Sequence, residues 1–201
     1  MPSSHHIALL GDSILDNARY VTAGQAVVNH VWQALQPDNA CSLVAVDGDT
    51  TRNVHAQLQR LPTETTHLVL SVGGNDALAW LPTLNQPAGS VMEALDHLQR
   101  IQAEFCQHYE TLLEQLHRVN KPTLVFTIYD AVPGLTPALR AALSLFNDVV
   151  LRTAMRHPFD ILELRDLLTQ PEDYSSVSPI EPSEQAGKKL ASAISKWVAN
   201  A

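Results

Sequence analysis

Hydrophobic and polar positions divide the chain into two alternating kinds of segment. Short, nearly continuous apolar runs are typical of buried strands, and they lie at residues 6–10, 42–46, 67–72, 123–128 and 160–164. Elsewhere apolar residues recur at three- and four-residue steps, which predicts amphipathic helices. These helices are expected at residues 25–36, 52–61, 91–116, 137–156 and 184–197.

This alternation of strand and helix indicates the fold class. Strands that are apolar on both faces belong to parallel sheets covered by helices on each side. We therefore predict an α/β protein, a three-layer α/β/α sandwich around a five-stranded parallel sheet. No linker or repeat interrupts the pattern, so residues 1–201 are expected to form a single domain.

Composition limits the possible partners. The 201 residues carry a formal net charge of -8 and no Lys/Arg cluster, which argues against nucleic acid or an anionic membrane. No apolar run approaches the ~20 residues of a membrane span, and the N-terminus does not resemble a signal peptide. Cys41 and Cys106 are far apart and are expected to be free thiols in a cytoplasmic protein. The sequence does not indicate the oligomeric state.

Three turns that follow predicted strands carry residues suited to chemistry. They are Gly-Asp-Ser at 11–13, Asp-Gly-Asp at 47–49 and Gly-Gly-Asn-Asp at 73–76. Each alone is ordinary turn chemistry, but all three should lie at the carboxyl ends of the strands, where such sheets bind ligands. Ser13 would then present its hydroxyl to three donors, namely its own N–H, the N–H of Gly48 and the side-chain amide of Asn75. A nucleophile beside such donors suits acyl transfer.

These segments resemble the SGNH/GDSL hydrolases. LLGDSILDN is similar to the first sequence block of that family, VDGDT to the second and SVGGNDAL to the third. The resemblance implies a flavodoxin-like strand order 2-1-3-4-5, with Ser13 as nucleophile and Gly48 and Asn75 in the oxyanion hole. It also implies a small-molecule acyl ester or other acylated substrate, with no metal or cofactor.

The last block departs from the family pattern. Where the family has Asp-x-x-His, this chain has Ser178 and Glu181. Ile180 and two prolines flank Glu181, so burial is expected to raise its pKa toward 6 or 7 and make it a usable base. Arg165 could pair with Glu181 and lower that pKa, hold an anionic part of the substrate, or brace the loop. Among the histidines, His55 alone starts near the correct end of the sheet.

The sequence leaves several functions open. The first is a serine-dependent ester, thioester or acetyl hydrolase in which Glu181 replaces histidine. The second is a non-catalytic binding protein that holds a carboxylate or acyl group in the same pocket. A third is an enzyme that receives its histidine from a partner chain. Leu78, Trp80 and Leu81 suggest an apolar wall beside the pocket, although core packing explains them equally well.

Overall fold

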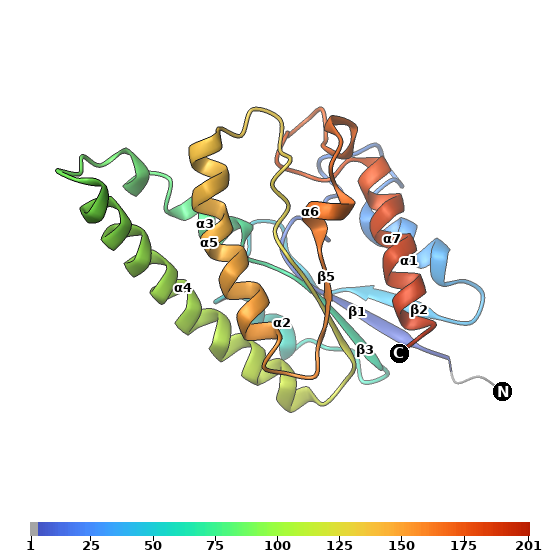
Figure 1. Ribbon diagram of the computed structural model, residues 1–201. Coiled ribbons are helices and arrows are strands. Elements are labelled where there is room, and N and C mark those ends of the chain that lie inside the picture. The colour runs from blue at the N-terminus through green and yellow to red at the C-terminus, as the bar shows by residue number, and fades with distance from the viewer. Residues whose placement is uncertain (1–3) are drawn as a thin grey trace.

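The computed structural model describes residues 4–201, and it contains one sheet covered by helices on both faces (Figure 1). The strands are β1 (His6–Gly11), β2 (Ala40–Leu43), β3 (His67–Ser71), β4 (Thr123–Phe126) and β5 (Asp160–Leu162). The α-helices are α1 (Val27–Leu35), α2 (Val54–Leu58), α3 (Gly74–Ala79), α4 (Val91–Val119), α5 (Pro137–Ala154), α6 (Leu164–Leu167) and α7 (Glu184–Val198). Two 3-10 turns, η1 (Thr83–Asn85) and η2 (Pro171–Asp173), complete the elements.

The five strands are all parallel and follow the order β2-β1-β3-β4-β5. This confirms the predicted three-layer fold and the flavodoxin-like order. Because the strands are parallel, the segments leaving β1, β3 and β4 emerge at the same edge of the sheet. From β1 the chain adds β2 on one side of the sheet and β3 and the later strands on the other, so the order switches between β1 and β3, and such a switch point places a crevice at that edge.

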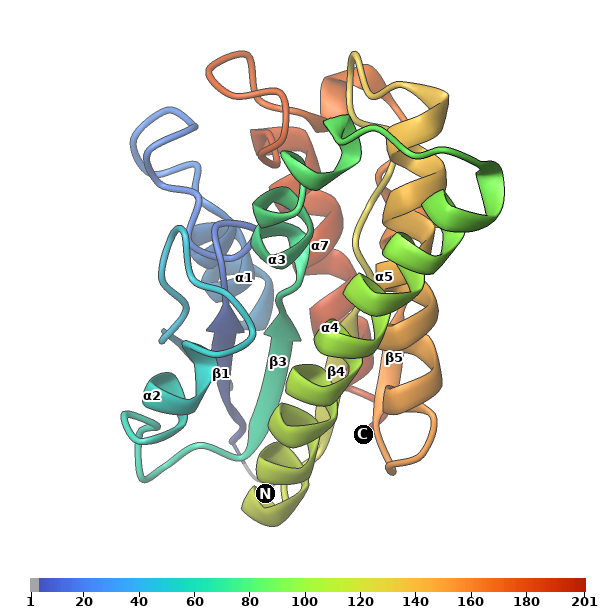
Figure 2. The same cartoon turned by 90° about the vertical axis from the view of Figure 1, so that its left-hand side faces the viewer.

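Two hydrophobic cores lie on opposite faces of the sheet. The first is formed by α1 and α7 against residues such as Ile7, Leu9 and Val69. The second is formed by α2, α4 and α5 against the alternate strand residues Leu10 and Leu68. Figure 2 shows α4 in front of the sheet with α7 behind it. Alternation along each strand therefore supplies both cores at once.

The strands β2, β3, β4 and β5 are shorter than the runs predicted for them, and hydrogen bonds explain the ends of β2 and β5. The edge strand β2 ends at Leu43 because the next two N–H groups, of Val44 and Ala45, both donate to the carbonyl of Leu9 and turn the chain away. Likewise β5 ends at Leu162, where the Glu163 side chain accepts from the N–H of Arg165 and begins α6. The helices α3 and α6 were not expected, because neither is long enough to show a periodic pattern.

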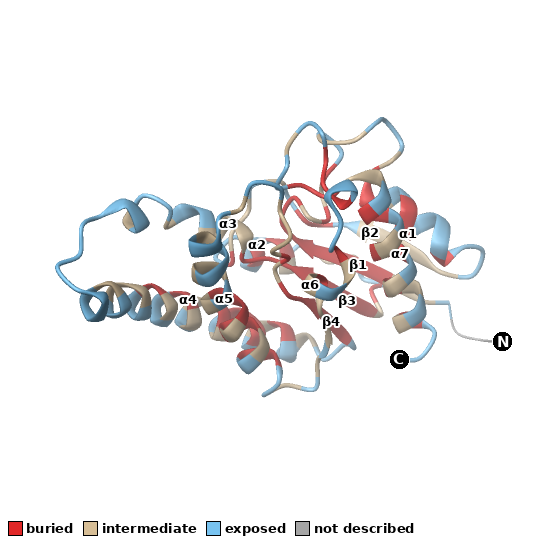
Figure 3. Ribbon diagram, turned by 45° about the horizontal axis from the view of Figure 1, so that its top comes forward, coloured by how far each residue is buried: buried red, intermediate tan, exposed pale blue. Residues whose placement is uncertain are grey.

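The longest helix, α4, is buried along only part of its length. Its apolar stripe is covered by core residues from Ile101 onward, whereas Val91 is 78% exposed. Figure 3 shows this N-terminal part of α4 in pale blue beyond the buried strands. Despite the length of α4, no helix within residues 4–201 is long and apolar enough to cross a membrane.

The contact between α1 and α7 depends on a glycine. Gly187, in the first turns of α7, faces the buried ring of His30 on α1. A Cβ at position 187 would lie 2.8 Å from His30 Cδ2 and 3.7 Å from the Val27 backbone. Glycine therefore allows the two helices to approach closely, although glycine is a poor helix former.

We predict that Gly187→Ala lowers the free energy of unfolding by about 1–3 kcal/mol, because the new methyl group overpacks the contact with His30. Urea denaturation measures the change. In a His30→Ala background the clash is absent, and alanine's better helix propensity should stabilise α7 by up to about 1 kcal/mol. An equal loss of stability in both backgrounds would show that His30 does not limit the size of the side chain at position 187.

Candidate active site

The structure brings Ser13 and Glu181 together across 168 residues of sequence. Ser13 follows β1 at the carboxyl edge of the sheet, and Glu181 lies in the segment that precedes α7. The Ser13 hydroxyl donates a hydrogen bond of 3.1 Å to Glu181 Oε1. Both side chains are buried, with exposed fractions of 6% and 5%. The two ends of the chain therefore meet in one buried polar pair.

The environment of Glu181 makes its carboxyl group a weaker acid than an ordinary glutamate. Burial raises its pKa to about 7, the hydrogen bond from Ser13 acts in the opposite direction, and the charge of Asp47 raises the pKa further. Its second oxygen, Oε2, has no hydrogen-bond partner among the described residues. A carboxylate held without a counter-ion in this way accepts a proton readily near neutral pH.

The main chain around Glu181 is fixed by hydrogen bonds from three different segments. Tyr129, after β4, donates from its hydroxyl to the carbonyl of Ile180. Asn17, after β1, donates from its amide to the carbonyl of Pro182 at 2.9 Å. The N–H of Ser175 donates to the carbonyl of Glu181 at 2.8 Å. None of these bonds uses the Glu181 carboxylate, which stays free to face Ser13.

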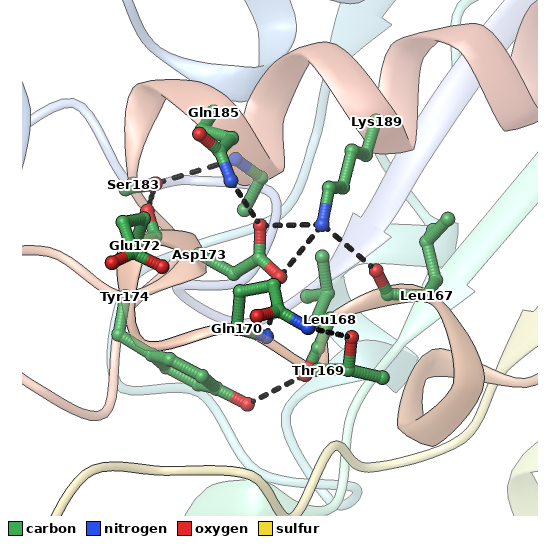
Figure 4. A network of polar contacts seen from close by, with 11 residues as sticks. Leu167, Leu168, Thr169, Gln170, Glu172, Asp173, Tyr174, Ser183, Gln185 and Lys189 are labelled. Atoms are coloured by element: carbon green, nitrogen blue, oxygen red, sulfur yellow. Dashed lines mark hydrogen bonds and ion pairs between the residues drawn. The ribbon is translucent and has the colours of Figure 1, made fainter.

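A second polar network holds the start of the same segment (Figure 4). The carboxylate of Asp173 is fully buried, and it accepts hydrogen bonds from Lys189 Nζ at 2.7 Å, from Gln185 Nε2 at 3.1 Å and from the Gln170 N–H at 3.0 Å. Burial raises the pKa of Asp173, but the Lys189 ammonium and the other donors outweigh it and hold the pKa below its usual value. This network ties the 170–183 segment to α7.

Asn75 and the 47–49 turn are joined to each other. The Asn75 side-chain amide donates to the carbonyl of Asp49 at 2.9 Å, and the neighbouring Asp76 accepts from the N–H of Thr51 at 3.0 Å. Gly48 has a φ of +86°, a backbone conformation that glycine adopts without strain. Asn75 lines the same pocket as Ser13, whereas Gly48 is exposed and is not among the residues lining that pocket.

Gln57 connects this turn to β1. It is fully buried on α2, where its Oε1 accepts from the Gly11 N–H at 2.8 Å. Its Nε2 donates to the Gly11 carbonyl at 2.7 Å and to Asp49 Oδ2 at 2.8 Å. This residue was not predicted to belong to the site, although a polar side chain among the apolar positions of the predicted 52–61 helix was a signal.

Asp12 is a second residue that the sequence analysis treated only as part of a turn. Its carboxyl group is 2% exposed, lines the pocket beside Ser13, and accepts from the Ile14 N–H at 3.1 Å. Burial raises the pKa of Asp12 well above its usual range; the hydrogen bond from Ile14 opposes this rise, and the charges of Glu181 and Asp76 add to it. The pocket therefore holds two carboxyl groups.

Two other candidate residues lie elsewhere. The Arg165 guanidinium engages the carboxylate of Glu163, with Nε donating to Oε1 at 2.7 Å, and it neither pairs with Glu181 nor lines the pocket. His55 faces α4 instead, where its Nδ1 lies 3.0 Å from Gln115 Oε1. Of the three roles open to Arg165, bracing the chain after β5 fits this contact.

A pocket of about 320 Å³ opens beside Ser13 and Glu181. Its walls are mainly apolar side chains from α3, α4, α5 and the segments that follow α3 and β4. They include Leu78, Trp80, Leu81, Leu84, Leu98, Ile101, Val132, Leu135, Leu139, Leu143 and Phe146. The suggestion that Leu78, Trp80 and Leu81 form an apolar wall is therefore confirmed.

Solved structures share this fold over nearly the whole chain. An esterase from Pseudoalteromonas, crystallised with monoethylphosphonate as inhibitor, has 19% identity and a TM-score of 0.64, covering 98% of this chain and 100% of its own. A lipase/acylhydrolase from Enterococcus faecalis has 20% identity and a TM-score of 0.69, covering 98% and 96%. A phospholipase A1 from Streptomyces albidoflavus has 19% identity and a TM-score of 0.69, covering 96% and 99%.

The fold and these neighbours define an SGNH-type hydrolase architecture. The model of the GDSL-like lipase/acylhydrolase family matches residues 9–185, so the chain belongs to that family. No curated protein matches it in sequence. The match spans all three turns as well as Glu181.

We predict that Glu181→Gln stabilises the protein increasingly as pH rises. In the unfolded chain a glutamate ionises near 4.3, whereas burial holds the pKa of Glu181 at about 7 in the fold. Ionisation therefore costs native stability between these values, and the variant should gain roughly 2–3 kcal/mol over the wild type between pH 5 and pH 8.

Urea denaturation at several pH values measures this difference. Glu172→Gln, which removes an exposed carboxyl group of η2, is the control and should show no pH-dependent gain. A constant difference between Glu181→Gln and the wild type at all pH values would contradict the raised pKa.

Proposed function

We propose that this protein hydrolyses carboxylic esters through a dyad of Ser13 and Glu181. The observation that carries the proposal is the 3.1 Å hydrogen bond from the Ser13 hydroxyl to a buried carboxylate whose pKa is about 7. A general base works best when its pKa lies near the operating pH. An exposed glutamate would be too weak a base to activate a serine hydroxyl.

The reaction begins when Glu181 takes the hydroxyl proton as Ser13 Oγ attacks the ester carbonyl carbon. The new C–O bond pushes the carbonyl electron pair onto oxygen and gives a tetrahedral oxyanion. In the proposal this oxyanion is stabilised by the N–H of Ser13 and the amide of Asn75, both of which line the pocket, and by the N–H of Gly48 in the turn that Asn75 contacts. Such a donor can contribute about 3 kcal/mol to the transition state.

Collapse of the intermediate breaks the bond to the alcohol, which leaves with the proton held by Glu181. The product is an acyl ester of Ser13. Water then attacks this ester while Glu181 takes its proton, and Glu181 returns that proton to Ser13 Oγ as the acid departs. Protons balance in each half of the reaction, and one carboxylate serves as base and then as acid.

The residues at the site weigh against a binding protein for carboxylates. The pocket contains the carboxyl groups of Asp12 and Glu181, and no Lys, Arg or His lines it among residues 4–201. A bound carboxylate would face like charge without a counter-ion, which disfavours binding. Arg165, which could have supplied one, is engaged by Glu163.

We predict that a fluorophosphonate probe labels the wild type at Ser13, with labelling that rises with pH and is half-maximal near pH 7 as Glu181 ionises. Ser13→Ala should not label, and Glu181→Gln should label and turn over p-nitrophenyl esters about 10²- to 10⁴-fold more slowly. Ser192→Ala, an exposed serine on α7, is the control. A wild type that neither labels nor hydrolyses esters would favour the binding protein.

We also expect the apolar pocket to hold the acyl chain. A volume of about 320 Å³ is roughly ten times the ~30 Å³ that one water molecule takes up in the liquid, so the pocket has room for a medium-length acyl chain. Octanoate esters should therefore be preferred to acetate esters. Leu143→Phe should lower kcat/KM about tenfold for p-nitrophenyl octanoate and leave the acetate ester within twofold, because the ring occupies the chain's space.

Leu43→Phe makes the same substitution at the exposed end of β2 and should change neither ester. Equal losses on both esters in Leu143→Phe would place the acyl chain outside this pocket.

A further inference from the structure

Apart from tyrosine, the ionisable side chains that line the pocket are all acidic. Its lining includes Asp12 and Glu181 and, among residues 4–201, no basic side chain. Two further carboxylates act on this pair from outside the lining. The charge of Asp47 raises the pKa of Glu181, and the charge of Asp76 raises the pKa of Asp12.

Two arginines that could neutralise these groups do not do so. Arg165 is paired with Glu163. Arg19 approaches Asp47 only at 3.7 Å, and its side chain is 83% exposed. An ion pair this exposed is screened by solvent and contributes little. The charge on the pocket lining is therefore negative when Glu181 is ionised, which is the state that the proposed reaction requires.

An unsatisfied acceptor lies in the same place. Glu181 Oε2 is buried and has no hydrogen-bond partner among the described residues, while Oε1 is occupied by Ser13. Beyond it, Tyr20 donates its hydroxyl to the Asp47 carboxylate at 3.0 Å. Burial, the hydrogen bond to Asp47 and the charges of Asp47 and Glu181 all raise the pKa of Tyr20, so the phenol ring lies close to both carboxylates.

We propose that the site selects esters by the charge of their alcohol, favouring cationic leaving groups of the quaternary-ammonium type over neutral ones and rejecting anionic ones. This inference rests on the proposed esterase function and names its substrate class. A cleft lined by one sign of charge raises the encounter rate of oppositely charged substrates by about 10- to 10³-fold. Phosphorylated carriers of acyl groups are disfavoured by the same field.

Three octanoate esters test this selection, because they differ only in the end of a two-carbon alcohol. They are octanoylcholine, its neutral isostere 3,3-dimethylbutyl octanoate, and the anionic 2-sulfoethyl octanoate. Each kcat/KM is divided by the rate of alkaline hydrolysis of the same ester. At low salt and pH 8 we expect the choline ester to exceed the neutral ester about tenfold and the sulfoethyl ester by 10²-fold or more. Added salt screens the charges, so it should bring these ratios closer to one.

Asp47→Asn removes one of the charges outside the reacting pair. It should lower the ratio of choline ester to sulfoethyl ester several-fold, because this ratio depends on the charge of the site and a change in overall rate cancels from it. Asp38→Asn makes the same charge change in the exposed turn before β2, at the opposite edge of the sheet, and should leave all ratios unchanged. If Asp38→Asn lowers the ratio of choline ester to sulfoethyl ester as much as Asp47→Asn does, the selection depends only on the net charge of the protein. That result would overturn the proposal.

The outcomes separate this inference from the esterase proposal. If no ester is hydrolysed, the esterase function itself fails. If the neutral ester is hydrolysed and the sulfoethyl and choline esters have equal kcat/KM values, the protein is an esterase but the proposed charge selection is wrong. The stated order of the three esters, together with its loss in salt and in Asp47→Asn, supports the inference.

Discussion

The buried hydrogen bond between Ser13 and Glu181 is the interaction on which the rest of the site depends. A carboxylate removed from water without a positive partner is costly to ionise, and this cost raises the pKa of Glu181 to about 7. Stability and reactivity are therefore opposed at this residue. The same burial that makes ionised Glu181 unfavourable in the fold makes it a competent proton acceptor.

The surrounding protein holds this unfavourable group in place through contacts that are themselves well satisfied. Asp173 and Lys189 form a buried, hydrogen-bonded pair at the base of the segment. Tyr129 and Asn17 bind the main chain on either side of Glu181. Stability lost at one carboxylate is thus offset by hydrogen bonds and packing that lie outside the pocket.

The sequence was sufficient to predict most of the fold and the central pair. Continuous apolar strands and periodic helices specified the sandwich, and the position of Glu181 between Ile180 and Pro182 correctly indicated a buried carboxylate. These features are local or repeat along the chain, so a pattern reveals them. The family resemblance also predicted that Ser13 and Glu181 lie together, although 168 residues separate them in sequence.

Other features depended on tertiary contacts that no pattern records. Arg165 was close enough in sequence to Glu163 to pair with it, but the choice between Glu163 and Glu181 required the geometry of the chain after β5. Gln57 became important because α2 places it against Gly11. The early end of β2 arose from two N–H groups competing for the Leu9 carbonyl. In each case a partner distant in sequence decided the outcome.

The main-chain hydrogen bonds around Glu181 also bear on how such sites diversify. Since Tyr129, Asn17 and Ser175 all bind backbone carbonyls of this segment, the path of the chain is independent of which side chain position 181 carries. One proton acceptor can then be exchanged for another without rebuilding the loop. In a fold with this property, one substitution at this position can change the pH range in which the site works.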